Sequence, residues 1–152
     1  MGLAREKITV ELPPERALAL WSDTRRWPTF VDGFARVQRV EGEWPEAGSR
    51  VVWESRPGGR GTVTEKVLEY DREGGRLVTQ VYEDALAGRQ SARFAPIDDG
   101  GTHVELELDY KLSQAGVLRR ITDVLFIRRA LTDSLGRTLV RFAREADEEA
   151  SL

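Results

Sequence analysis

The sequence contains no cysteine, one histidine and one methionine among its 152 residues. The absence of cysteine excludes disulfide bonds, thiolate nucleophiles and cysteine-ligated metals. A single imidazole, that of His103, leaves most catalytic triads and most zinc sites without a group that they need. We therefore expect no metal site and no cofactor.

Long apolar runs are also missing, and the charges nearly cancel. Nowhere do 18 apolar residues follow one another, and residues 1–7 contain neither an apolar run nor a small-residue cleavage site. Lys and Arg total 23 against 26 for Asp and Glu, so the formal net charge of -3 gives no reason to expect nucleic acid as a partner. We expect a soluble, cytoplasmic protein with one domain over residues 1–152. The composition leaves monomer and dimer open.

The middle of the chain has the alternating pattern of antiparallel strands separated by glycine-rich turns. The pattern is clearest over residues 102–112, where apolar and polar side chains alternate so that one face is apolar and the other is wet. A sheet with one apolar face must bury that face against another element, such as a helix. The expected strands span 7–12, 36–41, 49–55, 61–70, 76–83, 88–97 and 102–112.

Helical signals lie at the two ends of the chain. Pro14 suits the first turn of a short helix, and a second short helical piece is expected over 25–31. The longest helical stripe covers 116–150, where apolar residues recur at three- and four-residue spacing. We expect a gate segment over 117–127, followed by the helix that covers the sheet. Ser134 and Gly136 interrupt this helix in a way that favours a neighbouring cavity.

This order of elements, with several short segments, resembles the START-like or SRPBCC superfamily in its polyketide cyclase/dehydrase branch. The segments are Pro13-Pro14-Glu15-Arg16, Trp21-Ser22-Asp23, Trp27-Pro28-Thr29-Phe30, Gly48-Ser49-Arg50 and Gly101-Thr102. The resemblance covers almost the whole chain. It implies an α+β helix-grip fold, in which a curved antiparallel sheet of about seven strands wraps around a long C-terminal helix and two short helices follow the first strand.

The resemblance also implies a deep, mostly apolar cavity for a lipid, a polyketide or an aromatic molecule. Strand parity and this analogy together nominate residues that would contact the ligand, although the same residue types form ordinary core in small domains. The nominated residues are Trp27, Phe30, Val31, Phe34, Val51, Trp53, Ser55, Gln90, Ala92, Phe94, Val104, Leu106, Leu108, Tyr110, Phe126, Ala130, Ser134 and Leu135.

A polyketide aromatase/cyclase or dehydratase is the enzymatic alternative. It needs a proton donor or a cation beside a developing enolate, and hydroxyls that orient carbonyls. The resemblance implies Lys66 and Thr64 in these roles, but Phe34 and Thr62 stand where such enzymes have a pocket tyrosine and a pocket tryptophan. A set of carboxylates alternates with apolar residues and is interpreted as the solvent face. These are Glu65, Glu69, Glu83, Glu105, Glu107 and Asp109.

Three functions thus remain as hypotheses. The first is binding of a small hydrophobic molecule between the sheet and the C-terminal helix. The second is the cyclase or dehydratase reaction. The third is an interaction protein or a quinone or lipid chaperone, which would have an exposed apolar patch near Phe126 and basic residues beside it that could meet an anionic membrane.

Overall fold

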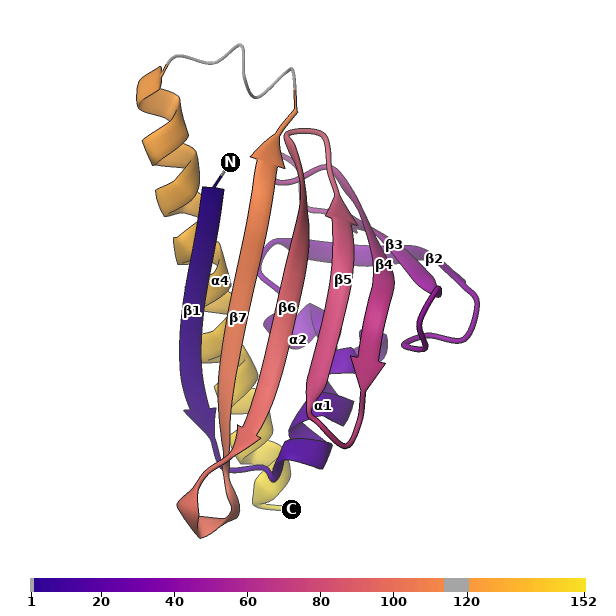
Figure 1. The fold of residues 1–152 in the computed structure, drawn as a ribbon, viewed down its shortest axis with the longest axis vertical. Helices are drawn as coiled ribbons and strands as arrows, with labels where there is room; N and C mark the ends of the chain where they lie inside the picture. The colour runs from indigo at the N-terminus through magenta and orange to yellow at the C-terminus, as the bar shows by residue number, and fades with distance from the viewer. Residues whose placement is uncertain (1, 114–120) are drawn as a thin grey trace.

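The computed structural model describes the backbone of residues 2–113 and 121–152, and all of their side chains except those of 121–124. Seven strands form one antiparallel sheet in the order β1-β7-β6-β5-β4-β3-β2 (Figure 1). The strands are β1 (Gly2–Val10), β2 (Phe34–Glu41), β3 (Arg50–Ser55), β4 (Thr62–Asp71), β5 (Arg76–Tyr82), β6 (Leu86–Pro96) and β7 (Thr102–Leu112). The first strand thus closes the edge beside the last one.

The helices cover one side of this sheet. Two short ones, α1 (Pro14–Ser22) and α2 (Trp27–Phe30), follow β1 and are joined by the 3₁₀ turn η1 (Thr24–Arg26). A second 3₁₀ turn, η2 (Asp98–Gly100), joins β6 to β7, and the long helix α4 (Ile121–Ala150) ends the chain. Figure 1 shows α4 running along β1 and β7, with α1 and α2 beneath the middle of the sheet. The predicted helix-grip fold is therefore confirmed.

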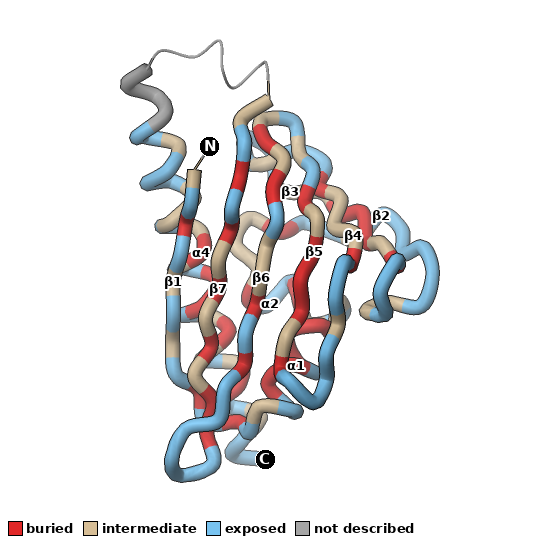
Figure 2. The backbone as a smooth tube through the Cα atoms, viewed as in Figure 1, coloured by how far each residue is buried: buried red, intermediate tan, exposed pale blue. Residues whose placement is uncertain are grey.

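The core lies between the sheet and the helices. The alternating side chains of β7 predicted to face inward are buried, among them Val104 and Leu106. From the other side, α4 contributes buried side chains at three- and four-residue spacing, as a helix with one apolar face requires. These are Leu135, Leu139, Phe142 and Ala146. Figure 2 shows the buried residues alternating along the strands with exposed ones.

Two expectations about α4 were wrong. The helix is continuous from Ile121, so residues 121–127 are not a separate gate segment; residues 117–120 of that predicted segment lie outside the described part of the chain. Gly136 does not line the interior cavity between the sheet and the helices; it lies at an open groove on the surface, where a Cβ built on it would lie 3.8 Å from Cδ of Glu6 on β1. The glycine instead faces the first strand.

The strand β4 carries a bulge that changes which residues face the core. Its pairing with β5 is regular up to Val67 opposite Thr79 and then shifts before Glu69 opposite Val78. Val63 and Val67 are buried before the shift, and the partly buried Tyr70 packs against the core after it. Because a bulge inserts one extra residue, the inward parity passes from odd to even numbers. Glu65 lies within the odd-numbered inward stretch.

Candidate functional site

An interior cavity lies between the sheet, the two short helices and α4. The space open to the centre of a water-sized sphere is about 40 Å³, which is room for a few waters. The cavity is therefore present but small in this conformation, whereas the sequence predicts a deep one. Its lining residues are Trp21, Trp27, Phe30, Val31, Trp44, Trp53, Arg60, Glu65, Leu77, Thr79, Gln90, Ala92, Leu106, Ser134, Leu135 and Thr138.

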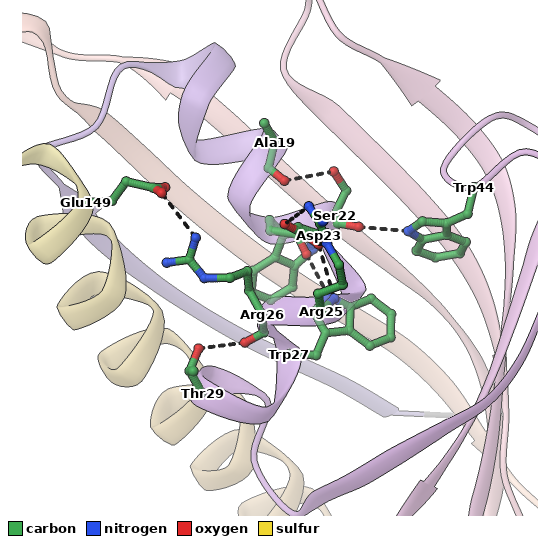
Figure 3. Close-up of polar contacts among 10 residues, drawn as sticks. Ala19, Ser22, Asp23, Arg25, Arg26, Trp27, Thr29, Trp44 and Glu149 are labelled. Atoms are coloured by element: carbon green, nitrogen blue, oxygen red, sulfur yellow. Dashed lines mark hydrogen bonds and ion pairs between the residues drawn. The ribbon is translucent and has the colours of Figure 1, made fainter. Parts of the chain in front are cut away.

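Indole rings form one wall, and hydrogen bonds fix their positions. Nε1 of Trp27 donates to the carbonyl oxygen of Trp21 at 2.8 Å, and Nε1 of Trp44 donates to that of Ser22 at 2.9 Å. Both acceptors lie at the end of α1, where helix carbonyls have no intrahelical partner. Figure 3 shows the Trp27 and Trp44 side chains beside Ser22. The Trp27 and Trp44 rings pack edge to face with centroids 5.7 Å apart. These bonds and ring contacts hold an apolar wall in place.

A carboxyl group, that of Glu65, interrupts the apolar lining on the sheet side. Nε1 of Trp53 donates to its Oε2 at 2.8 Å, and Oγ1 of Thr79 donates to its Oε1 at 3.3 Å. These partners come from β3 and β5, the two strands that flank β4, so the sheet itself orients the carboxyl group. Burial raises the pKa of Glu65, and this outweighs the opposing effects of Trp53, the Arg60 charge and Thr79.

The guanidinium of Arg60 is the second polar group of the lining. Its Nε donates to Oε2 of Glu83 at 2.6 Å, and the Glu83 side chain is only 4% exposed. The Arg60 Cζ atom lies 5.3 Å from the centroid of the Trp53 ring, within the range of a cation–π contact. Arg60 thus connects the end of β5, through Glu83, to the aromatic wall.

The turn between β3 and β4 directs Arg60 toward the cavity. The Ser55 amide donates to the carbonyl of Gly61 at 2.9 Å, and the Gly61 amide donates to Oγ of Ser55 at 2.8 Å. Gly61 has a φ of 77°, a backbone conformation that residues other than glycine adopt only at an energetic cost. The hydroxyl of Ser55 therefore stabilises the turn by accepting this hydrogen bond.

The structure corrects the interpretation of two carboxylates. Glu65 and Glu83 were assigned to the solvent face, but Glu65 lines the cavity and the Glu83 side chain is buried against Arg60. Conversely, Lys66 and Thr64 alternate with the inward residues of β4, and neither lines the cavity. The structure therefore does not bring the two residues with a predicted catalytic role to the site.

The residues nominated as ligand contacts divide into two groups. Half of them line the cavity, and these are Trp27, Phe30, Val31, Trp53, Gln90, Ala92, Leu106, Ser134 and Leu135. The others do not. Phe34, Val51, Phe94, Val104, Leu108 and Tyr110 are core residues around it, while Ser55, Phe126 and Ala130 line an outer groove. Phe126, expected at the cavity floor, is 70% exposed.

The outer groove lies between α4 and the β3–β4 and β5–β6 turns. It is lined by residues of both turns and by Phe126, Ala130 and Leu131 of the helix. Arg60 and Ser134 line both this groove and the interior cavity. The groove therefore adjoins the cavity, and these two side chains stand at its inner end.

The loop after α2 closes another side of the cavity and is bound to α4 through Asp32. Its carboxylate accepts from Oγ of Ser134 at 2.8 Å, from Nη2 of Arg137 at 3.1 Å and from Nη1 of Arg141 at 3.2 Å. The Asp32 amide also donates to Oγ1 of Thr138 at 2.9 Å. Because Val31 lines the cavity beside it, these bonds hold part of the cavity wall in place.

Sequence reasoning missed seven lining residues. Trp21, Leu77 and Thr138 were not nominated, although Trp21 and Leu77 lie in segments with a recognised apolar pattern. Trp44 and Arg60 lie in turns, where strand parity gives no information. Glu65 was missed because the pattern of β4 leaves its inward face ambiguous, although Glu65 shares the parity of the buried Val63 and Val67. Thr79 lies on β5 and was not nominated.

The chain matches a protein family over nearly its whole length. The model of the family described as polyketide cyclase/dehydrase and lipid transport matches residues 1–147. The chain therefore belongs to that family, as the resemblance to the SRPBCC superfamily predicts. No curated protein matches the chain in sequence. No helix among the described residues is both long enough and apolar enough to span a membrane.

Several solved structures share the fold. A protein from Thermus thermophilus is 21% identical, with 99% of this chain and 100% of that chain covered and a TM-score of 0.72. The di-domain aromatase/cyclase BexL of the BE-7585A biosynthetic pathway is 17% identical, with 98% and 47% covered and a TM-score of 0.75. Norcoclaurine synthase from Thalictrum flavum, in complex with a transition-state analogue, is 12% identical, with 98% and 96% covered and a TM-score of 0.70.

Proposed function

We propose that the protein binds a small, mostly apolar molecule in the cavity between the sheet and α4. The observation that carries this proposal is an aromatic-walled cavity with a polar group at one end. Binding sites for small molecules commonly combine such walls with a few placed polar groups. The family description, which names both polyketide chemistry and lipid transport, supports the same class of ligand.

Entry of a ligand requires the cavity to widen. Its present space of about 40 Å³ holds only a few waters, so side chains at the inner end of the groove must move. Arg60 and Ser134 stand there, and any movement of the Arg60 side chain must keep its ion pair with the buried Glu83. Burial of about 150 Å² of apolar ligand surface would contribute roughly 4 kcal/mol, which is enough to offset such a rearrangement.

Thermal unfolding and native mass spectrometry against a library of fatty acids, lipids and aromatic compounds would test the proposal. A ligand at 100 times its dissociation constant stabilises the folded state by about 2.7 kcal/mol, which raises Tm by roughly 5–10 °C in a chain of this size. Ala92→Leu narrows the cavity from the β6 side and should abolish this shift. Ala95→Leu adds the same side chain on an exposed position of that strand and should preserve it.

The absence of any bound molecule or thermal shift across the library would contradict the proposal. So would an equal shift in the wild-type protein and in the Ala92→Leu variant. Because overpacking alone costs about 1–3 kcal/mol, each variant is compared with its own ligand-free Tm.

A cyclase or dehydratase activity is a second candidate, favoured by the carboxyl of Glu65 and the guanidinium of Arg60 in one cavity. A proton donor and a cation are what a developing enolate needs beside it. Incubation with a poly-β-ketone, followed by mass spectrometry of the products, would test this. Turnover that is lost in Glu65→Gln and retained in Lys66→Ala would support it, whereas equal turnover in Glu65→Gln would contradict it.

A lipid or quinone chaperone is a third candidate, favoured by exposed apolar side chains at the outer groove and beside it. Leu125 and Phe126 are 71% and 70% exposed, and the exposed Arg128 and Arg129 lie on the same turns. Such a surface could contact an anionic membrane while a ligand passes to the cavity. Flotation with anionic vesicles should recover the wild-type protein and less of Phe126→Ser. Equal recovery with zwitterionic vesicles would argue against this role.

A further inference from the structure

The carboxyl group of Glu65 is costly to keep in its place as an ion. It lies among the side chains of the cavity, and its hydrogen bonds come from the neutral donors Trp53 and Thr79. A buried charge without a close, unshared counter-ion is strongly disfavoured. Arg60 is the cation whose charge acts on the Glu65 carboxyl group, but its guanidinium already forms an ion pair with Glu83.

The charges of Arg60 and Glu83 balance each other and leave the polar end of the cavity without net charge when Glu65 is an acid. Nη2 of Arg60 lies 2.5 Å from Oε2 of Glu83, whose side chain is almost fully buried. A positively charged ligand at this end would lie beside the Arg60 guanidinium in a medium of low dielectric constant. An uncharged ligand oxygen would instead find a donor there.

We infer that Glu65, in its acid form and with Arg60 beside it, donates a hydrogen bond to a carbonyl oxygen of the ligand. The site would thus prefer uncharged aromatic carbonyl compounds to amines. This inference rests on the proposed function, because it names the chemical class that the cavity binds. The Trp53 and Thr79 hydrogen bonds hold the carboxyl group in position, so little conformational freedom is lost when a ligand binds.

The interactions around Glu65 together shift its ionisation toward the acid form. Burial raises its pKa, and the charge of Glu83 adds to this, while the Trp53 hydrogen bond, the Arg60 charge and the Thr79 hydrogen bond oppose it. The raised pKa means that the acid form persists above the pH at which an ordinary glutamate ionises. A preference for carbonyl ligands should therefore weaken as the pH rises through the pKa of Glu65.

Three probes of similar size separate the possibilities, namely acetophenone, ethylbenzene and benzylamine. We expect acetophenone to bind about 5-fold more tightly than ethylbenzene, the value of one modest hydrogen bond, and benzylamine to bind most weakly. Dissociation constants would be measured by ligand-observed NMR on the intact protein. The ¹³C shift of the labelled Glu65 carboxyl group, followed over pH, would report its ionisation directly.

Variants of Glu65 assign the preference to this side chain. Glu65→Gln retains a donor and should keep the preference for acetophenone, without its pH dependence. Glu65→Met has a similar volume and no donor, and it should remove the preference while ethylbenzene still binds. Glu69→Gln removes a carboxylate from the exposed part of the same strand and should change none of the three constants.

A preference for acetophenone that survives in Glu65→Met would overturn the inference. Benzylamine binding as tightly as acetophenone to the wild-type protein would also overturn it. If none of the three probes binds but other molecules of the library do, the inference fails and the proposed function stands. If nothing binds at all, both fail.

Discussion

The bond between Asp32 and α4 yields a prediction whose magnitude follows from the structure. Asp32→Asn removes the negative charge that faces Arg137 and Arg141 and keeps one oxygen that can accept from Ser134. The Asp32 side chain is 18% exposed, but those of the two arginines are 54% and 42% exposed. Solvent screening therefore reduces each ion pair to about 0.5 kcal/mol. With the weakened Ser134 bond, the loss should total about 1–2 kcal/mol.

The pH dependence of this loss has a definite sign. Partial burial opposes ionisation of Asp32, but the hydrogen bonds from Arg137 and Ser134 and the two arginine charges outweigh it, so its pKa is lowered. A lowered pKa gives stability that is complete above the pKa of the unfolded state, about 3.9. This stability is lost as the pH falls through the pKa of the folded state. The gap between wild-type protein and variant should therefore be equal at pH 7 and 5 and smaller at pH 3.

Urea unfolding followed by tryptophan fluorescence at these three pH values would measure the gap. Asp133→Asn removes a carboxylate from an exposed position one residue before Ser134, and its effect should stay within about 0.5 kcal/mol. A gap that is absent at pH 7, or that is unchanged at pH 3, would refute the reasoning. It would mean that Asp32 does not bind the loop to the helix through its charge.

Three further variants test the packing around the site. Phe142→Ala should cost about 3–5 kcal/mol in urea unfolding, since the ring is fully buried, and a cost below 2 kcal/mol would count against a packed core there. Arg26→Ala should cost about 1 kcal/mol, because its bonds of 3.1 Å to Glu149 (Figure 3) and 2.9 Å to Glu145 join the short helices to α4; no loss of Tm would contradict this. Lys66→Ala should leave the ligand-induced rise in Tm unchanged. If the rise were lost in this variant, Lys66 would have to contribute to ligand binding.

The order and type of the elements were predictable because local patterns and tertiary structure agree. In β7 the apolar residues of the alternation from Val104 to Tyr110 are buried, and Pro14 begins α1 as its fixed φ allows. The strand ranges expected from the sequence differ from the observed ones by a few residues at their ends, except for β1, whose range was expected to start five residues later.

The polar part of the site could not be predicted for two physical reasons. The bulge between Val67 and Glu69 reverses the parity of β4, so an unbroken alternation cannot fit both ends of that strand. The general rule that glutamate faces solvent also fails where partners come from distant segments. For Glu83 the partner is Arg60, which reaches it from a turn 23 residues away in the sequence.

The division of α4 into a buried and an exposed part has a consequence for its local stability. From residue 125 on, where its side chains are described, the buried ones begin at Leu135, while Leu125 and Phe126 contribute almost nothing to the core. Backbone amides around 126–133 should therefore exchange their hydrogens through fraying of the first turns, and those around 139–146 only when the whole domain opens. One continuous helix thus contains two cooperative units, and a molecule bound in the outer groove would be measured as slower exchange in the first of them alone.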